Sequence, residues 1–133
     1  MTASRALFTS LSCEWATPIA LRQAIAAEFG DLWDPCPIGG SDGLIVDWQP
    51  RVFCNPPYGR ALPGWIDKGA EEMAAGRVQL IVWLLPARTD TRWFHNLILP
   101  SSSEIRFLKG RLHFSEGGEA TFPSMICIWK ATA

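Results

Sequence analysis

The sequence predicts an α/β fold in which helices flank a mostly parallel, open sheet. Segments with strand and helix patterns alternate along the chain, and the run LIVWLLP is apolar throughout, as in strands buried on both faces of a parallel sheet. At 133 residues, with 48% hydrophobic and 19% charged residues, the chain is long enough to bury one core and too short for two modules. We therefore expect a single domain over residues 1–133.

The first part of the chain predicts one helix and two strands. Thr17 followed by Pro18 is typical of a helix N-cap and first helical position, and the apolar residues that follow predict a helix over 18–29. The segments DLWDPC and RVFC predict strands that begin near residues 31 and 51, and both end in proline-rich loops.

The second part of the chain predicts a β-α-β unit followed by further strands. A helical spacing of apolar residues over 64–76 precedes the apolar strand within 77–87. The remaining expected elements are a helix over 88–99, a strand and turn over 104–114, and a last strand over 122–130. In open sheets of this kind ligands bind at the carboxyl ends of the strands, where both proline-rich loops fall.

Several classes of protein do not fit this composition. No run reaches the roughly 20 apolar residues of a membrane span, and the first residues lack the apolar centre of a signal peptide, so we expect a cytoplasmic protein with no membrane partner. The four cysteines show no close pair and no neighbouring histidine pair. We therefore expect free thiols and no metal site.

The charges are unevenly distributed although the net charge is only −1. Residues 51–113 carry nine basic and five acidic side chains, whereas residues 1–50 carry two basic and six acidic ones. A positive face on a nearly neutral molecule would suit contacts to nucleic-acid phosphates. An ordinary solvated surface with uneven charge remains the alternative.

The loop Asn55-Pro56-Pro57-Tyr58 predicts chemistry on an amine nitrogen. The amide oxygen of Asn55 and the carbonyl of Pro56 can accept both N–H bonds of a planar amine and favour a pyramidal nitrogen as it attacks a methyl group. The prolines stiffen the loop and bring no competing N–H. The ring of Tyr58 offers a stacking surface for a flipped base, a contact of about 1–3 kcal/mol. The alternative is a rigid turn without a chemical role.

The NPPY sequence resembles the catalytic loop of S-adenosylmethionine-dependent methyltransferases that act on amino or amide nitrogens. The segments EWATP, DLWDPC, DGL, LLPARTDTRWFH and FLKGRLHF are, in addition, similar to the small phage-type DNA N6-adenine methyltransferases. This resemblance covers roughly residues 13–130. It implies a reduced Rossmann-like methyltransferase fold, S-adenosyl-L-methionine as the cofactor and DNA as the partner.

The resemblance also implies a cofactor site. Thr17 and Pro18 match the part that meets the methionine end of the cofactor, and Asp34 matches the acidic residue near its amino group. Other residues expected to line or cover this pocket are Trp15, Pro35 and Cys36. Positions 37–50 are too few for the two strand–helix units that larger relatives have there, so the acidic residue for the ribose has no clear match. Asp42 and Asp47 are the candidates, with Asp42 favoured by the DGL segment.

The expected DNA contacts follow the apolar strand and the strand over 104–107. Arg88, Thr89 and Arg92 should stand at the same sheet edge as the NPPY loop, and Lys109 and Arg111 form a second basic segment. The alternative for the first group is a helix start with Asp90 as cap and Arg88 paired to it.

We therefore expect site-specific methylation of adenine N6 in DNA. The alternatives are an N-methyltransferase for RNA or protein glutamine and a nucleic-acid-binding relative without catalysis. With no insert for reading a long site, we expect relaxed specificity or a homodimer.

Overall fold

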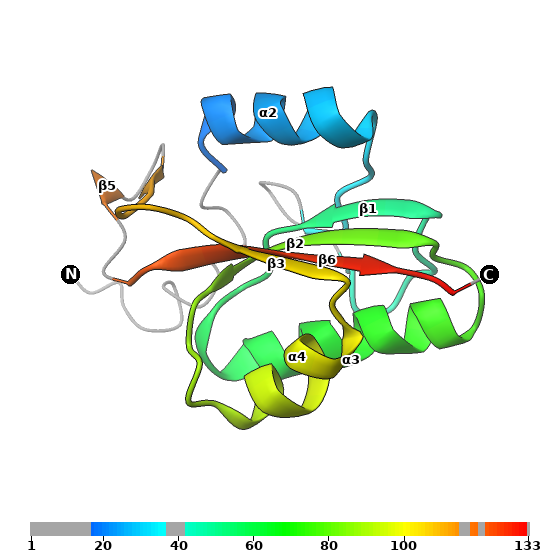
Figure 1. The fold of residues 1–133 in the computed structure, drawn as a ribbon. Coiled ribbons are helices and arrows are strands. Elements are labelled where there is room, and N and C mark those ends of the chain that lie inside the picture. The colour runs from blue at the N-terminus through cyan, green and yellow to red at the C-terminus, as the bar shows by residue number, and fades with distance from the viewer. Residues whose placement is uncertain (1–16, 37–41, 115–117, 120–121, 133) are drawn as a thin grey trace.

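The computed structural model describes residues 17–36, 42–114, 118–119 and 122–132 (Figure 1). These residues form an α/β domain with a four-stranded sheet in the order β1-β2-β6-β3 and a two-stranded sheet of β4 and β5. The strands are β1 (Arg51–Cys54), β2 (Leu80–Pro86), β3 (Glu104–Phe107), β4 (His113–Phe114), β5 (Gly118–Glu119) and β6 (Ser124–Lys130). The helices are α2 (Ile19–Phe29), α3 (Leu62–Ala74) and α4 (Leu99–Ser101), with a 3-10 turn η1 (Gly59–Ala61) and a π-helical segment η2 (Phe94–Ile98).

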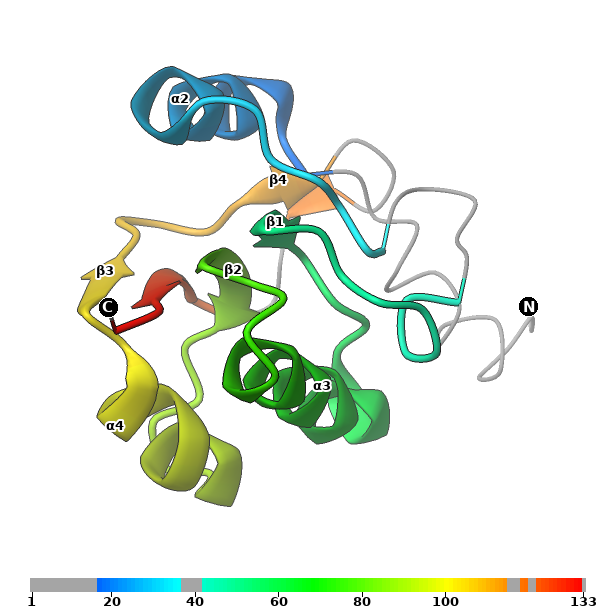
Figure 2. The ribbon, with the colours of Figure 1, turned by 90° about the vertical axis from the view of Figure 1, so that its right-hand side faces the viewer.

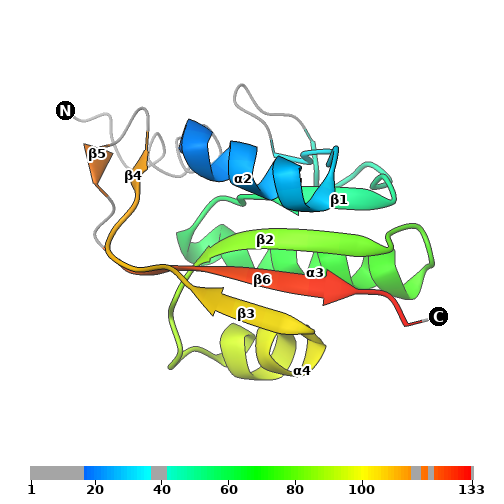
Figure 3. The same cartoon turned by 45° about the horizontal axis from the view of Figure 1, so that its top comes forward.

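The four-stranded sheet is mixed, which corrects the prediction of a mostly parallel, Rossmann-like sheet. β1 and β2 are parallel, but β2 with β6 and β6 with β3 are antiparallel pairs. β1, β2 and β3 therefore run in one direction, with the reversed β6 between β2 and β3 (Figure 3). The apolar run of β6 is buried on both faces, and such a run reads the same for either strand direction, so its sequence does not reveal the reversal.

Helices cover both faces of this sheet, as the view turned by 90° shows (Figure 2). On one face α2 packs Leu21, Ile25 and Phe29 against strand residues such as Phe53 and Val82. On the other face α3, η2 and α4 lie over a second cluster, whose largest members include Trp83 and Trp129. Successive side chains of β1, β2 and β6 alternate between the two clusters, as the pleat of a strand requires.

Most predicted elements are present, with three local differences. The predicted β-α-β unit is confirmed by the parallel pairing of β1 and β2 around α3. The expected strand near residue 31 is reduced to a single bridge between Trp33 and Val52. The expected helix over 88–99 is the segment η2 followed by α4, where Pro100 has no N–H for the α-helical bond to the carbonyl of residue 96. At the start of α2 the cap is Pro18 and no side chain caps the helix, so the prediction of Thr17 as N-cap is wrong.

The cysteines differ from the prediction at one position. Cys54 and Cys127 are free and buried, as expected. Cys36 is disulfide-bonded, which was not expected, and Cys13 lies outside the described residues. In the part of the chain that the structure describes, no helix is long and apolar enough to cross a membrane.

A buried carboxylate ties α3 to the segment that precedes β1. Glu72 is 1% exposed and accepts hydrogen bonds from the backbone N–H of Trp48 at 2.7 Å, from Lys68 at 3.1 Å and from Arg77 at 2.8 and 2.9 Å. The indole N–H of Trp48 donates in turn to the carbonyl of Gly43 at 2.7 Å. Glu72 and the indole of Trp48 together thus fix the chain between 43 and 48.

Candidate active site

The NPPY loop lies at the carboxyl end of β1, as predicted. Figures 1 and 3 show the start of α2, the carboxyl ends of β1 and β2, and the β4–β5 hairpin at the same end of the molecule. Phe53 and Cys54 are fully buried, so β1 anchors the loop in the core directly before Asn55. The parallel bridge between Trp33 and Val52 brings Asp34 to the same edge, because neighbouring parallel strands end together.

Asn55 is buried, with only 5% of its surface exposed, and hydroxyl groups contact both ends of its side-chain amide. Its Nδ2 donates to Thr17 Oγ1 at 3.2 Å, and its Oδ1 accepts from the hydroxyl of Tyr58 at 2.9 Å. Thr17 and Pro18, predicted on the cofactor side, therefore stand beside the predicted catalytic residue, with Thr17 in direct contact.

The rest of the loop is rigid and carries an aromatic side chain. Pro56 and Pro57 are both buried, and Tyr58 is half-buried against the ring of Phe122 at a centroid distance of 5.3 Å and an angle of 77°. Burial, and secondarily the nearby Cys54, raises the pKa of Tyr58 above its ordinary value of 10. The phenol is therefore neutral at physiological pH and can act as a hydrogen-bond donor.

Asp34 forms a turn with the residues that follow it. Its Oδ1 accepts from the backbone N–H of Cys36 at 2.8 Å. Its Oδ2 makes no hydrogen bond within the described part of the chain, and the residue is only partly buried. Burial raises the pKa of Asp34, while the Cys36 N–H and the charge of Arg22 lower it. One carboxylate oxygen is thus committed to the turn and the other is available to a ligand.

Asp42 is adjacent to the segment 34–36, and both were predicted to contact the cofactor. Gly43 lies so close to Pro35 that a Cβ at this glycine would be 2.3 Å from the Pro35 carbonyl oxygen and 2.6 Å from the ring of Trp65. This contact places the exposed Asp42 next to the segment 34–36. Asp47, the other candidate, lies 3.7 Å from Arg77 instead. The predicted contact at Trp15 lies outside the described residues.

The first predicted DNA-binding segment reaches the NPPY loop through Phe122. The guanidinium of Arg88 lies over the ring of Phe122 at 5.4 Å, and Phe122 in turn contacts Tyr58. Thr89 and Arg92 are exposed beside it. No ion pair between Arg88 and Asp90 is present among the described residues. Thr91 rather than Asp90 caps the following helical segment, where its Oγ1 accepts from the N–H of Phe94 at 3.2 Å.

The second basic segment lies at the same edge. The backbone N–H of Leu108 donates to the carbonyl of Ser124 at 3.0 Å, and that of Ala87 donates to the carbonyl of Pro123 at 2.8 Å. The chain after β3 and the chain after β2 therefore flank the start of β6. Lys109 and Arg111 are both exposed on this segment, around Gly110 with its positive φ of 74°.

Sequence reasoning missed two residues at this edge. Phe122, which contacts both Tyr58 and Arg88, was read only as the beginning of the last strand. Ser124 is 1% exposed, and its hydroxyl has no hydrogen-bond partner among the residues that the structure describes. A polar residue that opens an otherwise apolar strand was the available signal for Ser124. Phe122 gave no comparable signal, since an aromatic residue beside a strand usually packs in the core.

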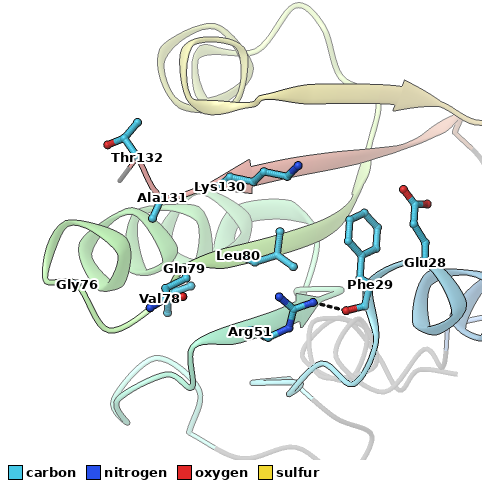
Figure 4. A pocket seen from close by; sticks show the side chains of 10 residues that line it. All are labelled: Glu28, Phe29, Arg51, Gly76, Val78, Gln79, Leu80, Lys130, Ala131 and Thr132. Carbon is cyan, nitrogen blue, oxygen red and sulfur yellow. Dashed lines mark hydrogen bonds between the residues drawn. The ribbon is translucent and has the colours of Figure 1, made fainter.

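An open groove of about 860 Å³ lies at the opposite end of the sheet (Figure 4). Its lining comes from the start of β1 and β2, the end of β6 and the end of α2, and includes Arg51, Leu80, Lys130 and Glu28. Arg51 donates to the carbonyl of Phe29, and Glu28 is paired with Arg106. None of the residues predicted to carry chemistry lines this groove, which is therefore separate from the candidate active site.

An α/β sheet with a buried asparagine, two buried prolines and a tyrosine at a strand end is the arrangement expected of a nitrogen-directed methyltransferase. A family model described as DNA N-6-adenine-methyltransferase (Dam) matches residues 39–131, which is 93 of the 133 residues. The chain belongs to this family. The matched region contains Asn55, Tyr58 and both basic segments, and it begins after Thr17 and Asp34. No curated protein and no solved structure matches the chain.

Proposed function

We propose that the protein transfers the methyl group of S-adenosylmethionine to the N6 amino group of adenine in DNA. Family membership supports DNA adenine methylation in general. The observation that carries the specific assignment is Asn55, whose buried amide is held by hydroxyl groups at the carboxyl end of β1.

Asn55 and Pro56 would act on the amine. The nitrogen of an aminopurine is planar and a poor nucleophile, because its lone pair is delocalised into the ring. Acceptors at Asn55 Oδ1 and the Pro56 carbonyl favour the pyramidal nitrogen, so the stabilisation appears mainly in the transition state. A carbonyl oxygen can accept two hydrogen bonds, so the bond from Tyr58 does not by itself exclude an amine from Oδ1. After transfer the extra proton of the amine can leave to water.

The residues around Asp34 fit a cationic cofactor. S-adenosylmethionine supplies the electrophilic methyl group on a sulfonium and also carries an ammonium group. The oxygen of Asp34 that the turn leaves available can accept from that ammonium and offset its charge at short range. Pro35 and Cys36 are buried beside it, and Asp42 lies next to this segment, where it could accept from a ribose hydroxyl.

DNA would approach the same edge. The ring of Tyr58 provides the stacking surface for a flipped adenine, and Phe122 packs against that ring in a T-shaped arrangement. Arg88, Thr89 and Arg92 with Lys109 and Arg111 would meet the phosphates around the flipped base. All five residues are exposed, as phosphate contacts require.

Methyl transfer to DNA, RNA and protein tests the proposal. With a labelled methyl donor we expect label in adenine of DNA. Asn55→Ala should lower transfer at least about 100-fold while cofactor affinity stays within about two-fold, since the amide acts on the amine. The matched control is Asn96→Ala, which changes an exposed asparagine of η2. Label in RNA or protein instead of DNA would show that RNA or protein is the substrate. Cofactor binding without methyl transfer to DNA, RNA or protein would show that the chain is a non-catalytic relative.

The salt dependence of DNA binding tests the basic segments. Arg88→Ala and Arg92→Ala should each lower the slope of log K against log salt by about one unit, since each would remove one phosphate contact. The control is Arg51→Ala, which removes a cation from the opposite end of the sheet. Equal slopes for all three variants and the wild type would show that these arginines do not bind phosphate.

A further inference from the structure

Thr17 reaches the proposed catalytic residue from a distant part of the sequence. It stands directly before α2, 38 positions ahead of Asn55, and its hydroxyl oxygen lies 3.2 Å from Asn55 Nδ2. The hydroxyl of Tyr58 lies 2.9 Å from Oδ1 at the other end of the amide. The two contacts clamp the amide between α2 and the NPPY loop.

The clamp favours one orientation of the amide over the flipped one. The two ends of an asparagine amide are alike in shape but opposite in function, because the oxygen accepts and the NH2 group donates. A phenol is a better hydrogen-bond donor than an aliphatic hydroxyl, since it is far more acidic. Tyr58 therefore favours the amide oxygen on its side, and Thr17 then serves as the acceptor for Nδ2.

We propose that Thr17 is a positioning residue that, with Tyr58, keeps Asn55 Oδ1 toward the substrate nitrogen, so that the site selects an amino group over a carbonyl group. This inference rests on the proposed function of Asn55. It differs from the role that resemblance implied for Thr17, a contact to the methionine end of the cofactor, because a positioning role acts on turnover and a cofactor contact acts on cofactor affinity.

Steady-state kinetics separate these two roles. Thr17→Val keeps the shape of the side chain but removes the acceptor, and we expect kcat to fall about 5- to 10-fold, the value of one hydrogen bond. The dissociation constant of S-adenosylmethionine should change by less than about two-fold. Thr17→Ser retains the hydroxyl and should restore kcat. Weaker cofactor binding with unchanged kcat at saturation would overturn the positioning role.

Nuclear magnetic resonance tests the clamp without any turnover. The chain contains only two asparagines, Asn55 and Asn96, so selective 15N-asparagine labelling gives two side-chain NH2 signals, which Asn96→Asp assigns. Thr17→Val should shift the Asn55 signal and leave that of Asn96 in place, whereas Thr17→Ser should change both little. An Asn55 signal that Thr17→Val does not move would refute the clamp.

The positioning role of Thr17 can still be tested if Thr17→Val does not fold or if the wild type is inactive. If Thr17→Val does not fold, Tyr58→Phe in the same labelled chain tests the other end of the clamp and should also move the Asn55 signal. If the wild type transfers no methyl group to any substrate, the proposed function fails, and the spectra still decide whether Thr17 orients Asn55.

Discussion

The change Glu72→Gln should destabilise the protein strongly, because it places a neutral amide where three groups donate to a buried carboxylate. Arg77, the backbone N–H of Trp48 and Lys68 together lower the pKa of Glu72 from 4.5 to about 2, against burial, which raises it. This pKa difference corresponds to roughly 3 kcal/mol of stability at neutral pH. Because the side chain of Arg77 is 44% exposed, solvent screens this ion pair, and the value is an upper limit.

Comparing the thermal unfolding of Glu72→Gln with that of Glu71→Gln measures the stability that the Glu72 carboxylate contributes. Glu71 is the exposed neighbour on the same helix, so its variant makes the same chemical change without the network. For a domain of this size we expect the melting temperature to fall by up to roughly 12 °C for Glu72→Gln and to change little for Glu71→Gln.

The pH dependence provides a second check on the same residue. A carboxyl group whose pKa is depressed in the folded state stabilises the fold above its unfolded pKa and loses that effect as pH falls toward its folded pKa. The gap between wild type and Glu72→Gln should therefore be full above pH 4.5 and close as pH falls toward 2. Equal melting temperatures for the two glutamine variants at pH 7, or a gap that persists at low pH, would refute the reasoning.

Three further predictions test the site and its support. Gly43→Ala should cost about 2 kcal/mol or more of unfolding free energy, because its Cβ would meet the Pro35 carbonyl oxygen at 2.3 Å, while Gly64→Ala in open space on α3 should gain up to about 1 kcal/mol. Chemical denaturation measures both variants, and equal unfolding free energies for Gly43→Ala and Gly64→Ala would contradict the close contact at Gly43. Ser124→Ala should leave stability unchanged or raise it by up to about 1 kcal/mol, since its buried hydroxyl has no partner in the described part of the chain. A clear loss of stability would reveal a partner. Tyr58, the only tyrosine, should resist ionisation above pH 10 until alkali unfolds the protein, because the unfolded chain loses a proton that the folded one keeps. A rise in phenolate absorbance at a pH below that of unfolding would contradict this prediction, because it would show that the Tyr58 hydroxyl ionises in the folded protein.

The sequence predicted the elements that local patterns determine. Helical spacing predicted α2 and α3, apolar runs predicted β2 and β6, and the βαβ unit followed from their order. The position of the NPPY loop at a strand end was also predictable, because the loop follows an apolar strand and such loops lie at the carboxyl edge. These features depend on neighbours within a few residues in the chain.

Features that depend on distant contacts were not predictable. The direction of β6 is set by its pairing with both β2 and β3, and its own residues are apolar throughout. The contact between Phe122 and Tyr58 joins positions far apart in the chain. Thr17 shows the same limit: its sequence context is that of a helix cap, yet its hydroxyl bonds to Asn55, which only the packing of α2 on the sheet brings near.

The central position of β6 has a consequence for synthesis on the ribosome. β6 follows the other five strands that the structure describes, yet it pairs along its whole length with β2 and also with β3. Until β6 has left the exit tunnel, β2 and β3 each present an unpaired edge that can capture another nascent chain. Translation that stalls or terminates before Ser124 should therefore yield chaperone-bound or aggregated fragments rather than a partly folded domain. The sheet then closes in one late step, after the residues up to Lys130 have been synthesised.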